Sequence, residues 1–185
     1  MKPLHAILLF AALAACARQG HKYHDAKMDF SSIHTVAVMP FGNLSRDNLA
    51  ADRVRDKFSS LLLASGAMYV LPIGEVARGI TRASVANPVM PSKDEVIALG
   101  KALGAEAVIT GTLTEYGEVR AGTNAANVVS LTLEMLETTT GTVVWSASTT
   151  KGGIGIGDRL LGGGGAPMNG VTEDACHDLL DRLFN

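Results

Sequence analysis

Three acidic side chains are the first candidates for chemistry in this sequence. Glu115, Glu118 and Glu134 fall in strand-like segments, where they could meet on the wet face of a sheet. Paired carboxylates serve as acid and base only in a pocket that shifts their pKa values. Nothing in the neighbouring sequence indicates such a pocket, so we expect a solvated charged face and no catalytic residues.

Two closely spaced histidines are the next candidates, because imidazole is a common metal ligand. His21 and His24 are three residues apart and could share one metal ion. A zinc site takes three or four protein ligands, and this pair supplies two. We therefore expect a solvated linker without metal. His34 and His177 stand alone and are expected to be structural or surface residues.

A glycine-rich segment is the third candidate. Residues 152–157 read GGIGIG, but Leu160 stands where a dinucleotide-binding Gly-x-Gly-x-x-Gly motif requires its third glycine. The patterns Gly-x-Ser-x-Gly, His-Glu-x-x-His and Gly-x-x-x-x-Gly-Lys-Ser/Thr do not occur in the chain. The sequence therefore predicts a protein that is not an enzyme and uses no cofactor.

The same glycine-rich segment is a candidate for contact with a partner. Residues 152–165 read as a flexible loop that carries two adjacent apolar side chains, Leu160 and Leu161. Exposed apolar residues on loose segments often become ordered on binding. The alternative is a short helix that packs the two leucines back onto the core.

The amino terminus has the pattern of an export signal. Lys2 gives a positive start, residues 4–14 are almost wholly apolar, and Ala14-Ala15 precede Cys16. The residues at the end of this apolar segment resemble the lipobox, which bacterial lipoprotein signal peptidase cuts just before cysteine. The resemblance implies that Cys16 carries lipid, including palmitate. A signal peptide cleaved at Ala15 without lipidation is the alternative. Because Ala17 follows the cysteine, we expect anchoring in the outer membrane, facing the periplasm.

These features divide the chain into three parts. Residues 1–15 are expected to be cleaved, residues 16–30 to form the lipidated cysteine and a polar tether, and residues 31–185 to form one domain. A formal net charge of −2 gives no indication of nucleic-acid binding. Lipidation of Cys16 would leave Cys176 without a partner, so we expect a buried thiol, with a reactive or intermolecular thiol as the alternative.

The first half of the domain alternates strand and helix. Residues 35–41 and 68–71 read as strands, whereas residues 51–62 have helical periodicity and residues 74–80 a short helix. Ser92 and Glu95 fit a capping box for a helix that Gly104 ends.

The second half reads as three strands and a helix. Residues 107–116, 128–137 and 142–149 are strand-like, and Gly141 fits the turn between the last two. An amphipathic helix at residues 171–184 should pack across the sheet, with Val38, Leu131, Leu133 and Trp145 buried. The pattern predicts an α/β domain with a mixed sheet of about five strands and packed helices.

Several segments carry a resemblance to a known superfamily. These are residues 36–43, the sequence LGAEAVITGTLTEYGE at 103–118, residues 131–136 and the sequence TGTVVW at 140–145. They resemble bacterial envelope lipoproteins that include the curli secretion channel subunit, the penicillin-binding-protein activator lipoprotein and the amino-terminal domain of TolB. The resemblance implies a single domain with an anticodon-binding-domain-like, TolB-amino-terminal-like fold that binds proteins, can self-associate and is not an enzyme.

One departure from the channel subunit limits the resemblance. That subunit inserts long membrane hairpins, whereas we expect residues 117–127 to be a connection of about a dozen residues. We therefore expect no pore, and a membrane-anchored accessory protein that binds another envelope protein in assembly, secretion or cell-wall synthesis. A periplasmic module for a small molecule or glycan is the alternative, and a cell-wall hydrolase is a weaker one.

Overall fold

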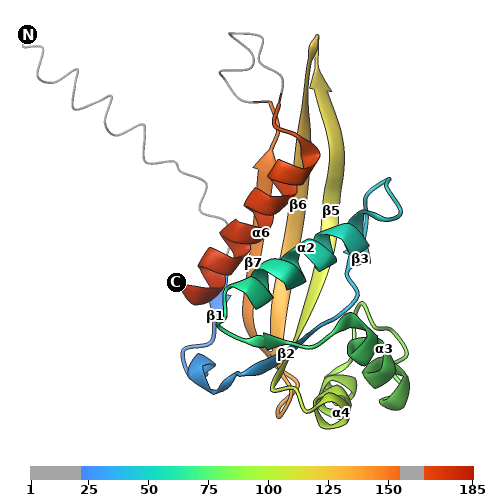
Figure 1. Ribbon diagram of the computed structural model, residues 1–185, viewed down its shortest axis with the longest axis vertical. Helices are drawn as coiled ribbons and strands as arrows, with labels where there is room; N and C mark the ends of the chain where they lie inside the picture. The colour runs from blue at the N-terminus through green and yellow to red at the C-terminus, as the bar shows by residue number, and fades with distance from the viewer. Residues whose placement is uncertain (1–21, 155–164) are drawn as a thin grey trace, which may run out of the picture.

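A seven-stranded mixed sheet forms the centre of the protein, whose computed structural model describes residues 22–154 and 165–185. The strand order is β1-β7-β6-β5-β2-β4, and β3 pairs with β5 beyond the end of β2 (Figure 1). The strands are β1 (Lys22–His24), β2 (Thr35–Val38), β3 (Gly42–Asn43), β4 (Tyr69–Val70), β5 (Ala107–Ala121), β6 (Asn124–Glu137) and β7 (Val143–Gly152). The predicted mixed α/β domain is confirmed, with short β1 and β3 beyond the five strands expected.

The sheet combines two kinds of pairing. Strands β5, β6 and β7 form an antiparallel meander, whereas β2 runs parallel to both β4 and β5. Parallel neighbours need a crossover, and the helices supply it. The helices are α2 (Ala50–Ala64), α3 (Ile73–Arg82), α4 (Lys93–Leu103) and α6 (Met168–Phe184), with a 3-10 turn η2 (Phe30–Ser32) after β1.

Local sequence signals set several of these boundaries. The Ser92 hydroxyl accepts a hydrogen bond from the Glu95 amide, and the Glu95 carboxylate accepts one from the Ser92 amide, so the predicted capping box begins α4. Gly104 ends that helix in the left-handed conformation at φ 66°. Gly141, also at φ 66°, lies in the turn between β6 and β7 as predicted.

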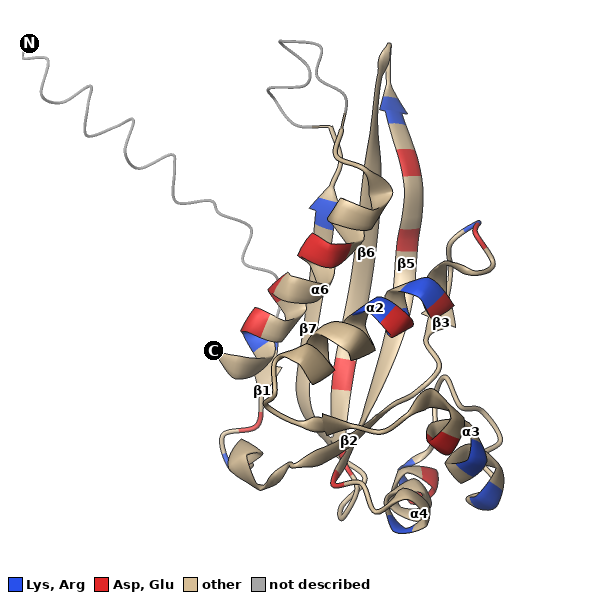
Figure 2. Cartoon of the chain, in the orientation of Figure 1, with Lys and Arg blue, Asp and Glu red and all other residues tan. Residues whose placement is uncertain are grey.

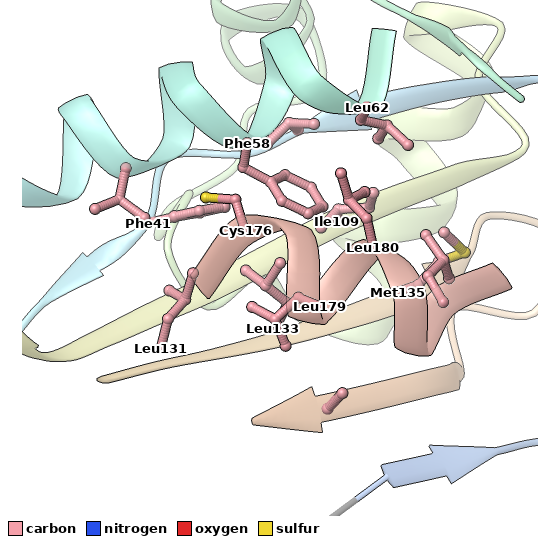
Figure 3. Packing of buried hydrophobic residues seen from close by; sticks show 14 of the residues in the cluster. Phe41, Phe58, Leu62, Ile109, Leu131, Leu133, Met135, Cys176, Leu179 and Leu180 are labelled. Atoms are coloured by element: carbon pink, nitrogen blue, oxygen red, sulfur yellow. The ribbon is translucent and has the colours of Figure 1, made fainter. Parts of the chain in front are cut away.

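Helices α2 and α6 cover one face of the sheet and enclose the larger core (Figures 1 and 3). Phe58 from α2 and Leu179 from α6 are fully buried against Leu131 and Leu133 of β6. Trp145 is also fully buried, and its indole Nε1 donates a 3.1 Å hydrogen bond to the Arg182 carbonyl in α6. The predicted burial of Val38, Leu131, Leu133 and Trp145 is confirmed.

The opposite face is covered at one end, where α3 and α4 form a second core. It contains Ala37 of β2, Val108 of β5 and Met39, which directly follows β2, packed against Val96 and Leu99 of α4. Further along this face the strands carry hydroxyl side chains such as Ser130 and Thr132, which match the period of two expected for a wet surface.

Two sequence-based boundaries were wrong. The segment assigned to the tether contains β1, which pairs with β7 from Lys22 opposite Ala147 to His24 opposite Trp145. The expected connection at residues 117–127 is instead the continuation of β5 and β6. Their pairing runs without a gap from Glu115, opposite Ser130, to Ala121, opposite Asn124.

Within the described residues, no helix is long and apolar enough to cross a membrane.

Candidate protein-binding surface

Cys16, Leu160 and Leu161 lie outside the described residues, so the structure does not place them. The described flanks of the glycine-rich loop both reach Asn127 of β6. The Gly153 amide donates to the Asn127 carbonyl at 2.8 Å, and the Asn127 amide group donates to the Ala166 carbonyl at 2.9 Å. Both flanks are therefore fixed to one point on β6.

The three carboxylates considered for catalysis do not converge. Glu134 lies opposite Thr110, whereas Glu115 lies opposite Ser130, five residues further along β5. Five residues of strand span about 16 Å, so these two carboxylates cannot share a proton or a metal ion. All three side chains, Glu115, Glu118 and Glu134, are exposed, as expected for a solvated charged face.

The histidines are also dispersed. His24 lies in the edge strand β1, where its ring stacks on Phe30 with ring centroids 4.0 Å apart. His177 lies on the exposed side of α6, 3.9 Å from the Glu173 carboxylate. Among residues 22–154 and 165–185, no three histidine, cysteine or acidic side chains group as metal ligands would.

Cys176 is fully buried in the core between α6 and the sheet (Figure 3). Burial raises the pKa of its thiol to about 12, the charge of Lys57 opposing this effect and that of Glu173 adding to it. The thiolate is the reactive form of cysteine, so this side chain behaves as a small apolar residue. The predicted buried thiol is confirmed, and its burial disfavours the reactive alternative.

A groove of about 800 Å³ lies beside α2 and α6. Its walls come from α2, the first turns of α6 and Tyr116 of β5, and its lining includes Lys57, Ser60, Met168 and Thr172. Ion pairs border it: Arg53 lies 2.7 Å from the Asp47 carboxylate, and Lys57 lies 3.3 Å from the Glu173 carboxylate. Figure 2 shows basic and acidic positions along α2 and α6. The groove is thus polar at its border and partly apolar inside.

The loop of residues 44–49 rises at one end of this groove, between β3 and α2, and its shape is fixed by hydrogen bonds. The Asn43 side-chain oxygen accepts from the Ser45 amide at 3.0 Å, and its amide group donates to the Asp47 carbonyl at 2.8 Å. Asp47 in turn accepts from the Leu49 amide at 2.9 Å and from Arg53 at 2.7 Å. Side-chain bonds of this kind define Asx-type turns.

Two leucines of this ordered loop face solvent. Leu44 is 70% exposed and Leu49 is 57% exposed. A loop held by hydrogen bonds presents these side chains without losing further chain entropy on binding, which favours association. We name this feature the leucine loop.

A free strand edge continues the surface. Strand β3 pairs with β5 at Thr112 and Leu113, and within the described residues no strand pairs with that edge further along β5. The edge passes Glu115 and Glu118, and Val119 near its end is 38% exposed. Open edges can accept a strand from another protein.

The leucine loop, the groove and the β5 edge form one surface suited to a protein partner. It offers exposed apolar side chains, paired charges and unpaired backbone groups, and no group of metal ligands lies among its described residues. The sequence analysis missed it, although the apolar residues Leu44 and Leu49 flanking four polar residues were a visible signal. Their exposure depends on where β3 docks, which periodicity does not show.

Comparison with known families shows which family the chain belongs to. The sequence model of the family described as peptidoglycan-synthase activator LpoB matches residues 19–150. The chain belongs to the LpoB family. The LpoB family is described by its activation of a peptidoglycan synthase and is non-enzymatic, so the predicted envelope-lipoprotein resemblance and the prediction that the protein is not an enzyme are confirmed. No curated protein sequence matches the chain.

Solved structures share the fold of this LpoB-family protein. A PelC dodecamer from Paraburkholderia phytofirmans is 18% identical, with a TM-score of 0.59 over 89% of this chain and 97% of that one. The lipoprotein GNA1162 from Neisseria meningitidis is 19% identical, with a TM-score of 0.59 over 82% of this chain and 99% of that one. The protein CT253 from Chlamydia trachomatis is 13% identical, with a TM-score of 0.56 over 82% and 96%.

Proposed function

We propose that this protein is a lipid-anchored accessory protein that binds a peptidoglycan synthase through the leucine loop and the neighbouring groove and stimulates its activity. The family match over residues 19–150 is the observation that carries the proposal, because it favours an activator over a small-molecule binder or a hydrolase. The surface adds a physical route, since apolar anchors beside a polar rim are typical of protein interfaces.

Site-specific photo-crosslinking tests the proposed docking surface. A photoreactive amino acid at Leu44 or Leu49 should crosslink to a synthase in intact cells, because both side chains are exposed next to the groove. Leu63 is the matched control, since it is 53% exposed but lies at the other end of α2. Crosslinking from Leu63 alone, or equally from all three positions, would contradict the assignment of this surface.

A polymerisation assay tests the activity itself. Purified protein should increase the rate at which the synthase, once identified by crosslinking, polymerises glycan chains. The variant Leu44→Ser with Leu49→Ser should lose that increase while keeping its fold. An unchanged rate with wild-type protein would rule out an activator of that synthase.

We propose lipidation of Cys16 as the means of anchoring. Cys16→Ala should abolish incorporation of labelled palmitate, because the lipid is joined through that thiol. The wild-type protein should fractionate with the outer membrane, facing the periplasm. Wild-type levels of label on the variant would disprove lipidation, and recovery with the inner membrane would disprove the membrane assignment.

Leu160 and Leu161 remain a proposed second contact. Changing both to serine should weaken partner capture while leaving the melting temperature nearly unchanged. A loss of a few kcal/mol of stability would instead place the pair in the core.

Self-association is the second candidate function, favoured by the fold shared with a protein whose structure is a dodecamer. It predicts a defined oligomer of the purified lipoprotein in analytical ultracentrifugation. A monomer at all tested concentrations would leave the activator proposal unaffected and eliminate this one.

A further inference from the structure

We infer that the β1 edge of the sheet lies directly on the membrane that holds the lipid of Cys16, in contact with anionic phospholipid headgroups. The inference rests on the proposed lipidation of Cys16. It assigns an orientation to the domain and limits where its protein partner must be.

The length of chain between anchor and fold is the first argument. Five residues, 17–21, separate Cys16 from Lys22, the first residue of β1. An extended chain spans at most about 3.6 Å per residue, so β1 begins within roughly 20 Å of the lipid attachment point. That distance is smaller than the domain itself, so one side of the domain must be close to the headgroups.

The second argument is that β1 is held in the sheet and cannot lengthen the tether without breaking bonds. All three of its residues pair with β7, and the Asp25 amide donates a 2.8 Å hydrogen bond to the Val144 carbonyl. The His24 ring also stacks on Phe30 at 4.0 Å. The place where the chain leaves the fold is therefore fixed on the β1 edge.

The chemistry at this edge suits a headgroup layer. Tyr23 is 50% exposed and Phe184, beside β1 at the carboxyl end of α6, is 42% exposed (Figure 1). Aromatic side chains are favoured at membrane interfaces. Residues 17–29 contain Arg18, Lys22 and Lys27 against Asp25 and Asp29, a net charge of +1 in a chain whose total is −2.

One basic charge remains in this segment after its acidic groups are counted. The Asp29 carboxylate accepts hydrogen bonds from the Ser31 hydroxyl and amide at 2.6 and 3.0 Å, which lower its pKa and keep it ionised. The described basic side chains, Lys22 and Lys27, are both exposed. Basic side chains beside a membrane are attracted to anionic lipid, and the effect declines within a Debye length of about 8–10 Å.

The orientation turns the proposed docking surface away from the membrane. Four strand spacings of about 4.8 Å separate β1 from β3 across the sheet, or about 19 Å. The leucine loop follows β3 on that far side. With β1 on the headgroups, this places β3 and the leucine loop that follows it about 20 Å from the membrane. A partner must extend to that distance to be bound.

Fluorescence quenching in vesicles tests this orientation. Mature lipoprotein, its lipid confirmed by mass spectrometry, is reconstituted in phosphatidylethanolamine–phosphatidylglycerol vesicles with a headgroup-attached quencher. A fluorophore is placed on Tyr23→Cys or on Leu44→Cys, since Cys176 is buried and its thiol pKa is raised to about 12. We expect severalfold stronger quenching at position 23 than at position 44. Equal quenching at both, or none at 23, would overturn the inference.

A variant with a longer tether tests whether position 23 is quenched because it contacts headgroups or only because the short tether keeps it near the membrane. A twenty-residue Gly/Ser insert after Gly20 should keep the preference for position 23, and Lys22→Glu with Lys27→Glu in that background should reduce it by about tenfold or more. Loss of the preference with the native lysines, or no effect of the charge reversal, would refute the contact. Absence of lipid in the mass spectrum would instead refute the lipidation proposal before any vesicle is prepared.

Discussion

Helix α6 and the leucine loop border the same groove but are ordered in different ways. Helix α6 buries Val171, Ala175, Leu179 and Leu183, and its order comes from apolar packing on the sheet. The leucine loop is ordered by the hydrogen bonds of Asn43 and Asp47 and leaves its leucines in solvent. The residues that stabilise the fold are therefore different from those proposed to bind the partner. Changes in α6 should affect folding, and changes in the leucine loop should affect binding.

The largest effect should follow loss of the indole that joins α6 to the sheet. Trp145→Ala should lower the free energy of unfolding by about 3–5 kcal/mol, because the side chain is fully buried and bonds to the Arg182 carbonyl. Chemical denaturation measures the change. Tyr69→Ala, which removes a 56% exposed aromatic, is the control. A change below about 1 kcal/mol for Trp145→Ala would contradict the assigned core.

A glycine pair tests how firmly the end of β7 is packed. Gly152 has φ +80°, and a methyl group there would collide with the Asn127 carbonyl and approach Val171 of α6. Gly153 has φ +84° but no atom near the same position. Both alanine variants carry the backbone strain, so Gly152→Ala should cost about 1–3 kcal/mol more than Gly153→Ala. Equal melting temperatures for Gly152→Ala and Gly153→Ala would show that the backbone can shift at the contact between β7 and β6 at little cost in stability.

Asp178 of α6 forms ion pairs with Lys151 of β7 and Arg182 of α6, so its titration tests the polar contact between α6 and β7. Burial raises the pKa of Asp178, but hydrogen bonds from Lys151, Arg182 and Thr149 outweigh burial, and with the charge of Lys151 they lower it to about 2. The folded pKa is below the unfolded value of 3.8, so the stabilisation is present above about pH 4 and lost as the pH falls through about 2.

Asp178→Asn should therefore lower the free energy of unfolding by about 1–2 kcal/mol at neutral pH, and the difference should shrink below pH 4. Urea denaturation over this pH range measures it. Asp174→Asn is the control, because Asp174 is exposed on the same helix. A difference that stays constant down to pH 2 would show that the effect is not due to titration of Asp178.

The sequence predicted those parts of the fold that local patterns determine. The capping box at Ser92 and Glu95, the turn at Gly141 and the alternation in β6 each depend on a few neighbouring residues. The family resemblance also came from contiguous segments. The strand-like pattern weakened after Tyr116, where Gly117 and polar residues interrupt the hydrophobic alternation, so the extension of β5 and β6 was missed.

The missed features depend on contacts between distant residues. Residues 22–24 are polar and aromatic, and β1 exists because the outer edge of β7 is available to pair with them. Three residues with a single pairing partner leave no periodic signal. The candidate site was missed for the same reason, since the exposure of Leu44 follows from β3 pairing at Thr112 and Leu113.

The smallest effect on stability should come from the leucine loop, and it is the change that most directly tests the contrast with α6. Leu44→Ser with Leu49→Ser should alter the free energy of unfolding by less than about 0.5 kcal/mol each, because both side chains are already in water. The same variant should weaken capture of the synthase by at least tenfold, as expected when central apolar anchors of an interface are lost. Leu63→Ser, on the exposed side of α2, should change neither quantity. If the double variant instead unfolds at a clearly lower temperature, the loop is part of the folded core and the binding surface must lie elsewhere. If stability and capture are both unchanged, the hydrogen bonds of Asn43 and Asp47 order the loop for a reason other than binding this partner.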